Sequence, residues 1–106
     1  MHIVIFVTAA HKQEAEHIAK QLLKNKLAAC VNIVPKINSF FWWQAKIDRA
    51  EEVLLIIKSK KAKLNKIIKL VKSLHSYQVP EIIALPIIGG YKPYLRWLDE
   101  SLRKSA

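Results

Sequence analysis

The spacing of apolar residues in the first quarter of the chain predicts a buried strand followed by an amphipathic helix. Residues 2–8 form a short apolar run rich in β-branched side chains, which is typical of a buried strand. Over residues 12–26 the apolar positions recur every three or four residues, so one face of a helix is apolar. The members of this face are Ala15, Ile18, Ala19, Leu22 and Leu23. We expect Asn25 to end the helix in a left-handed conformation.

The middle third of the chain predicts a long β-hairpin. Residues 27–47 have the pattern of extended chain, and Pro35 predicts a bulge, a bend or a sheet edge because proline cannot donate to a ladder. A tight connection is expected at residues 48–49, before a second apolar strand over residues 51–59. Four consecutive aromatic residues lie near the end of the first arm: Phe40, Phe41, Trp42 and Trp43.

The second half of the chain predicts a lysine-rich helix, a last strand and a terminal helix. Residues 60–74 have an apolar stripe with lysines on the opposite face. Residues 79–88 have the pattern of a strand, and the glycine pair at 89–90 predicts the turn that ends it. Pro93 suits the first turn of a final helix. Arg103 and Lys104 would complement the carboxyl end of its dipole.

The order of these elements predicts one α+β domain over residues 1–106, of ferredoxin-like βαββαβ architecture with an extra C-terminal helix and a long β-hairpin. A helix of about 14 residues is roughly 21 Å long and shields about six residues of strand. The hairpin is much longer, so its aromatic tip would overhang the covered sheet. Exposed edges of this kind are unfavourable unless they are paired. We therefore expect the hairpin to pair with another copy of the chain and close a ring, with Phe40, Phe41, Trp42 and Trp43 at the interface.

Composition supports self-association but leaves a second interpretation open. The chain is 52% hydrophobic, which is more than a small monomer needs, and its net charge is +10. The lysines of the second helix are expected to form a solvated face. The alternative is a module that binds RNA or another anionic partner through this helix. The predicted third strand carries no aromatic residue of the kind that RNA-binding domains of this topology use, so nucleic acid is disfavoured.

The remaining features exclude several classes of protein and site. No stretch approaches the roughly 20 apolar residues of a membrane span, and residues 1–7 have the pattern of a strand and not of a signal peptide. The single cysteine, Cys30, is expected to be an inert core thiol in a reducing compartment, which predicts a cytoplasmic protein. Enzyme motifs are missing, and the adjacent Glu51 and Glu52 would point to opposite faces of a strand. We expect no catalytic residues, no bound cofactor and no enzymatic activity.

Motifs along nearly the whole chain resemble those of the CutA family, the divalent-cation tolerance proteins. They are Leu27 to Ile33, Ser39 with Phe41 to Trp43, Lys46-Ile47, Glu52 to Lys58, His75 with Tyr77, Val79 to Ile83, and Tyr94 to Leu98. The resemblance implies a tight homotrimer built by strand pairing between subunits, in a cytosolic protein of divalent-metal (copper) tolerance. It also implies likeness to the trimeric PII signalling proteins, whose clefts between subunits bind small effectors.

The resemblance also implies a metal site for Cu²⁺ or another divalent cation. The copper ligands proposed for the family correspond here to Val7, Leu74 and His75, of which only His75 can bind a metal. Glu81 is the nearest candidate for a second ligand, from the same or a neighbouring subunit. The chain departs from the family pattern at Ser76, where proline is usual.

Overall fold

The computed structural model describes residues 1–103, so the predicted role of Lys104 lies outside the described residues. The elements are β1 (His2–Ala9), α1 (Lys12–Lys24), β2 (Cys30–Trp43), β3 (Lys46–Lys60), a 3₁₀ turn (Lys61–Lys63), α2 (Leu64–Leu74), β4 (Ile82–Pro86) and α3 (Lys92–Leu102). This order confirms the predicted α+β fold with a long hairpin and an added C-terminal helix. No helix among residues 1–103 is both long enough and apolar enough to cross a membrane.

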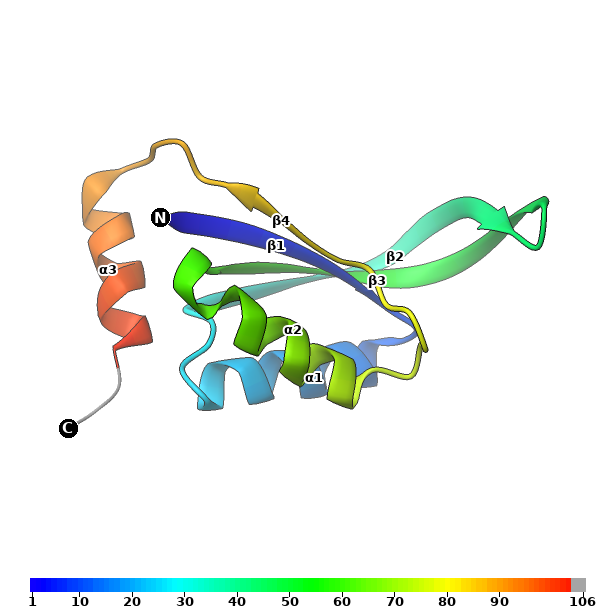
Figure 1. The fold of residues 1–106 in the computed structure, drawn as a ribbon, viewed down its shortest axis with the longest axis horizontal. Coiled ribbons are helices and arrows are strands. Elements are labelled where there is room, and N and C mark those ends of the chain that lie inside the picture. The colour runs from blue at the N-terminus through cyan, green and yellow to red at the C-terminus, as the bar shows by residue number, and fades with distance from the viewer. Residues whose placement is uncertain (104–106) are drawn as a thin grey trace.

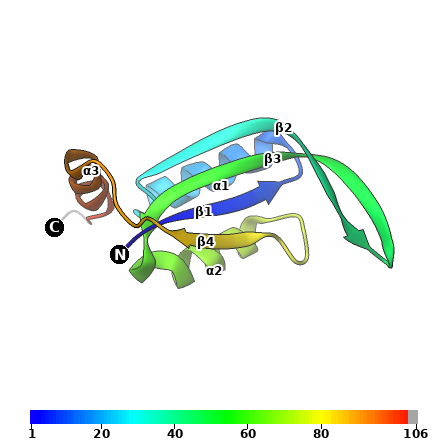
Figure 2. The same cartoon turned by 90° about the horizontal axis from the view of Figure 1, so that it is seen from above.

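The strands form one antiparallel sheet in the order β2-β3-β1-β4, and α1 and α2 cover one of its faces (Figures 1 and 2). The core lies between these two layers, where alternate strand residues meet the apolar stripes of the helices. Its fully buried large side chains include Ile5, Val7, Ile18, Leu22, Leu55, Ile57, Ile67 and Val71. Leu23, predicted as part of the stripe of α1, lies at its edge and is 41% exposed.

The β2–β3 hairpin extends well beyond the helical layer, as Figure 1 shows. The predicted irregularity at Pro35 is confirmed, because the register of β2 against β3 breaks between Val34 and Ile37 and Lys36 has a φ of 58°. The predicted turn at residues 48–49 is wrong. The hairpin reverses at Gln44 and Ala45, whose φ values of 49° and 63° match the two left-handed positions of a turn that suits the twist of the strands.

Two other element ends differ from the sequence prediction. Asn25 has a φ of −89°, and the left-handed residue after α1 is Lys26, with a φ of 58°. The Asn25 amide instead donates to the Gln21 carbonyl at 2.8 Å, which satisfies a carbonyl at the end of the helix. The last strand is shorter than predicted because β4 pairs only with Ile3–Val7 of β1, which leaves the residues on either side of it outside the ladder.

The prediction for Cys30 is also wrong. Cys30 lies on β2, an edge strand, and its thiol is only partly buried, with the Lys58 Nζ at 4.0 Å from its Sγ. Its side chain belongs to the face of the sheet that neither α1 nor α2 covers. That face is otherwise rich in apolar side chains, namely Val4, Phe6, Val34, Leu54, Ile56, Ile83 and Leu85, all of them partly or largely exposed.

Neighbouring leucines of α1 provide a test of where the core lies. Leu22 is fully buried, whereas Leu23 is 41% exposed. We expect Leu22→Ala to lower the free energy of unfolding by about 2–5 kcal/mol, because it leaves a cavity in the core. Leu23→Ala should change that free energy by about 0.5 kcal/mol or less. Urea denaturation at one protein concentration measures both, and equal losses would contradict this placement of the helix.

Candidate functional site

The side chain of His75 is fully buried at the point where four segments of the chain meet. It follows α2, and its ring lies against the end of β1 and the start of α1. Its Nε2 is 2.7 Å from the Thr8 carbonyl oxygen, and its Nδ1 is 3.0 Å from the Tyr77 backbone nitrogen. A carbonyl can only accept and a backbone N–H can only donate. The Nε2 therefore donates to the Thr8 carbonyl and the Nδ1 accepts from the Tyr77 N–H, so both nitrogens are occupied.

Glu14 ties the same turn to the first helix. One carboxylate oxygen accepts from the Ser76 backbone N–H, and the other accepts from the Ser76 hydroxyl and the Ala10 N–H, each at 3.1 Å. Burial acts to raise the pKa of Glu14, but these donors outweigh it and hold that pKa below its ordinary value of 4.5. The carboxylate thus joins the chain before α1 to the chain after α2.

Tyr77 connects the His75 turn to the hairpin. Its ring lies 4.8 Å from the His75 ring, and its hydroxyl donates to the Glu52 Oε2 at 2.8 Å. Burial and the bond to Glu52 raise the pKa of Tyr77 to about 12, so the phenol keeps its proton and acts as a donor. Glu52 lies on β3 just beyond the end of β1 and is only 7% exposed.

A cavity of about 820 Å³ opens beside Tyr77 and Glu52, between the outer half of the hairpin, from Glu52 at its base to Trp43 near its tip, and the segment that leads into β4. Three carboxylates line it, those of Asp48, Glu52 and Glu81. The rest of its lining combines aromatic and small polar residues: Thr8, Ser39, Phe40, Phe41, Trp43, Ala50, Tyr77, Gln78 and Val79. On a chain of net charge +10, the cavity is thus a concave region with three acidic side chains in its lining.

The two predicted metal ligands differ in their relation to the cavity. Glu81 lines the cavity, whereas His75 lies behind Tyr77 and outside that lining. Among residues 1–103, no group of three or more His, Cys, Asp or Glu side chains is arranged to hold a metal ion. A metal ion that reached His75 would have to replace one of its two hydrogen bonds. A metal site at His75 and Glu81 stays a prediction that requires groups from another subunit.

The aromatic tip divides between the cavity and the solvent. Phe40, Phe41 and Trp43 contribute to the lining of the cavity, while Trp42 does not. All four are exposed in the single chain, from 39% for Phe41 to 74% for Trp42. The structure therefore leaves the predicted interface residues without cover from their own chain.

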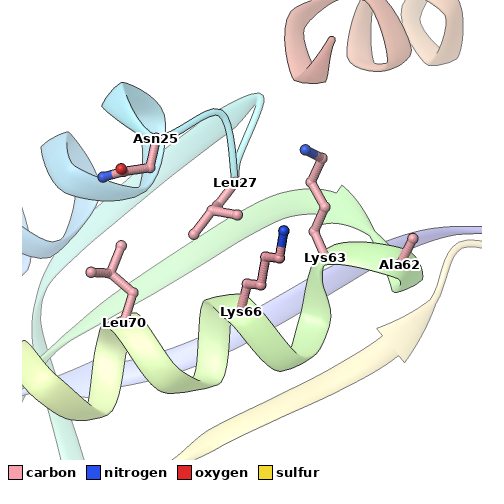
Figure 3. Close-up of a pocket in the computed structure, with 6 residues that line it drawn as sticks. All are labelled: Asn25, Leu27, Ala62, Lys63, Lys66 and Leu70. Atoms are coloured by element: carbon pink, nitrogen blue, oxygen red, sulfur yellow. The ribbon is translucent and has the colours of Figure 1, made fainter. Parts of the chain in front are cut away.

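A smaller cavity of about 410 Å³ lies between the end of α1 and the start of α2. Figure 3 shows Lys63 of the 3₁₀ turn, and Lys66 and Leu70 of α2, on one side, with Asn25 and Leu27 from the end of α1 and the loop after it on the other. Its lining has no carboxylate, imidazole or thiol, so it offers no strong ligand for a divalent metal. The lysines of α2, such as Lys66 and Lys69, face the solvent as predicted.

Sequence reasoning missed Glu14 and Glu52 as members of this site. Glu52 carries one signal, since it is a charged residue at the start of an otherwise apolar strand run. The extra residues of the bulge before Ile37 set which residue of β2 faces Glu52, and their exact placement is not visible in the sequence. Glu14 meets Ser76 across 62 positions of sequence, a contact that only the packing of α1 beside α2 creates.

Comparison with known proteins gives one consistent result. The sequence model of the CutA1 divalent ion tolerance protein family matches residues 3–101. A divalent-cation tolerance protein CutA of Archaeoglobus fulgidus is 50% identical over 102 residues, which cover 96% of this chain and 99% of that protein. A chloroplastic CutA 1 protein of Oryza sativa subsp. japonica is 48% identical over 103 residues, which cover 97% of this chain and 58% of that protein.

Solved structures agree with the sequence comparison. The structure of a periplasmic divalent cation tolerance protein CutA from Archaeoglobus fulgidus has a TM-score of 0.94 at 50% identity, covering 97% of this chain and 100% of that one. A divalent cation tolerance protein from Thermus thermophilus has a TM-score of 0.93 at 44% identity, covering 95% of this chain and 98% of that one.

The Glu14 contacts predict how stability depends on pH. A carboxyl whose pKa is lowered by folding stabilises the protein above its unfolded pKa, and this contribution is lost as the pH falls through the folded value. We expect Glu14→Gln to lower the free energy of unfolding by about 1–3 kcal/mol near neutral pH. The difference from the wild type should shrink below a pH of about 4.5, the ordinary value for this group.

Denaturation curves between about pH 7 and pH 3 measure this difference. Glu16→Gln is the matched control on the same helix, because the Glu16 side chain is 43% exposed and its ion-pair contact is Lys12, at 3.9 Å. A wild-type advantage over Glu14→Gln that stays constant with pH would contradict the assigned role of the charge.

Proposed function

Because the chain belongs to the CutA1 divalent ion tolerance protein family, which is non-enzymatic, we propose that it acts as a homotrimer in divalent-metal (copper) tolerance. In this proposal a metal ion or a small effector binds in the clefts between subunits, in the manner of PII-like signalling proteins. The trimer forms the clefts, and binding there reports or buffers the ligand.

The main observation in support of the proposed trimer is the length of the hairpin. β2 has 14 residues and β3 has 15, whereas β1 has 8, so the far half of the hairpin pairs with no other strand of its own chain. Trp42 is 74% exposed and Trp43 is 60% exposed on this overhang. Large exposed aromatic groups on an unpaired edge favour pairing with another copy of the chain.

The uncovered face of the sheet supports the same proposal. Phe6 lies between Ile56 and Ile83 in the register of the strands, so an apolar row crosses three neighbouring strands on the side opposite to α1 and α2. Ile83 is 51% exposed and Leu85 is 43% exposed. Burying such a surface against identical surfaces of other subunits would stabilise the assembly in proportion to the apolar area removed from water.

The proposed ligand site is the acidic cavity and the His75 turn behind it. Glu81 and Asp48 line the cavity and are exposed in the single chain, and in this proposal a neighbouring subunit completes the cleft beside them. His75 would take part through Nδ1, which has a lone pair that now accepts from the Tyr77 N–H. A cytoplasmic location and the alternative role of the α2 lysines in binding RNA stay predictions.

Light scattering tests the trimer. We expect a mass of three times the 12.2 kDa chain at micromolar concentration. Trp42→Glu places a charge at the proposed interface, at a position that is 74% exposed in the single chain, so it should weaken the assembly without unfolding the subunit. Lys69→Glu, on the exposed face of α2, should leave the mass unchanged. If the wild type has the mass of one chain, the proposal of a trimer is wrong.

Titration calorimetry with Cu²⁺ tests the metal site. We expect heat from the wild type, and binding weaker by about tenfold or more for His75→Ala and for Glu81→Gln, because each removes a ligand. His17→Ala is the control, since His17 is an exposed residue of α1. If the binding heat is unchanged in His75→Ala, His75 is not part of the metal site. If the wild type gives no heat, the proposal of a metal site is wrong.

A further inference from the structure

Glu52 is a buried carboxylate for which residues 1–103 provide no cationic partner. It is only 7% exposed, and its Oε2 accepts from the Tyr77 hydroxyl at 2.8 Å. None of the ion pairs formed by residues 1–103 involves Glu52. Among these residues, the neutral Tyr77 phenol is therefore the one hydrogen-bonding partner of the Glu52 carboxylate. Burying a carboxylate without a counter-charge is costly, so a buried group of this kind calls for a cation.

The second oxygen of Glu52 is left for a ligand. Among residues 1–103, no buried side-chain oxygen or nitrogen lacks both a hydrogen-bond partner and contact with solvent. The Glu52 Oε1 makes no hydrogen bond to these residues, so it must reach solvent, and Glu52 belongs to the lining of the 820 Å³ cavity. A nine-tenths-buried carboxylate thus presents one free oxygen to a space large enough for a small organic molecule.

Within a single subunit, the lining of the cavity suits an organic cation better than a bare metal ion, whose proposed site at His75 and Glu81 needs groups from another subunit. No group of three or more metal-ligating side chains converges among residues 1–103, although three carboxylates line the cavity. The carboxylates are thus spread along it and do not form a cage around one point. Phe40, Phe41 and Trp43 supply aromatic surface to the same lining. Aromatic faces attract ammonium groups and pack against hydrocarbon, whereas a hard divalent ion needs several oxygen ligands close together.

We propose that this cavity binds a linear aliphatic diamine or polyamine in its ammonium form. Glu52, held by Tyr77, is the buried counter-ion for one ammonium group. Asp48 and Glu81 take the second, and the aromatic side chains pack along the hydrocarbon between the two charges. This assignment deepens the small-effector part of the proposed function and rests on it.

Calorimetry on the full chain in its native oligomeric state tests the proposal with 1,4-diaminobutane and spermidine as probes. The matched neutral ligand is 1,4-butanediol, which has the same hydrocarbon without the charge. We expect heat from both amines and none from the diol. Glu52→Gln keeps the shape of the side chain and an acceptor for Tyr77 but removes the charge. It should weaken amine binding by about 30-fold or more.

Control variants separate a specific site from general attraction. Glu16→Gln changes the net charge by the same amount on the exposed surface of α1 and should leave amine affinity unchanged. Tyr77→Phe removes the donor that holds Glu52, so it should weaken binding less than Glu52→Gln does. Thermal denaturation checks that each variant is folded, and the amine–diol comparison on the wild type decides the matter if a variant is not.

Three results would overturn the inference. These are no amine heat from the wild type, equal heat from the diol, and equal losses in Glu52→Gln and Glu16→Gln. If the amines give no binding heat while the wild type has the trimeric mass and binds Cu²⁺, the proposed ligand class is wrong and the proposed function stands. If light scattering gives the mass of a single chain, the proposed function is wrong, whichever ligand binds.

Discussion

The mismatch between a long hairpin and a short helical layer is the constraint on which the rest of the structure depends. α1 has 13 residues and so covers about 20 Å, whereas the 15 residues of β3 span about 50 Å. The molecule is accordingly 48 Å long and only 27 Å by 22 Å in the other directions. One end of the sheet has a complete core, and the other end consists of paired strands without a covering layer. The exposed aromatic tip and the cavity at the base of the hairpin both follow from this difference in length.

The base of the hairpin is fixed by polar contacts because the apolar core ends there. Glu14 holds Ser76, His75 holds Thr8 and Tyr77 holds Glu52, so four segments are joined by hydrogen bonds where helix packing stops. Satisfied polar networks of this kind are geometrically specific, since each member has directional partners. The network therefore sets the position of the hairpin against the turn after α2, and with it the shape of the cavity.

The sequence predicted the features that depend on periodicity and not those that depend on contacts between distant segments. The strands, the helices and the bulge at Pro35 follow from local patterns, and the structure confirms them. The hairpin turn was misplaced because Gln44 and Ala45 adopt left-handed conformations without a glycine to mark them. Cys30 was placed in the core because the order of strands in the sheet, which puts β2 at an edge, is not a local property. Of the candidate site, His75 and Glu81 were named, while Glu52 and Glu14 acquire their roles only through the fold.

Charge and shape together favour cation binding at the base of the hairpin over any site on the helices. A net charge of +10 disfavours cations over the surface as a whole, so a concave acidic region stands out as a place where they would concentrate. The cavity meets this condition with Asp48, Glu52 and Glu81, and its walls reduce the screening of those charges by water. Its aromatic wall comes from the same segment that lacks cover in a single chain. The proposed assembly and the proposed ligand site thus share Phe40, Phe41 and Trp43, so in this proposal a ligand in the cavity affects how the subunits associate, and association in turn affects affinity.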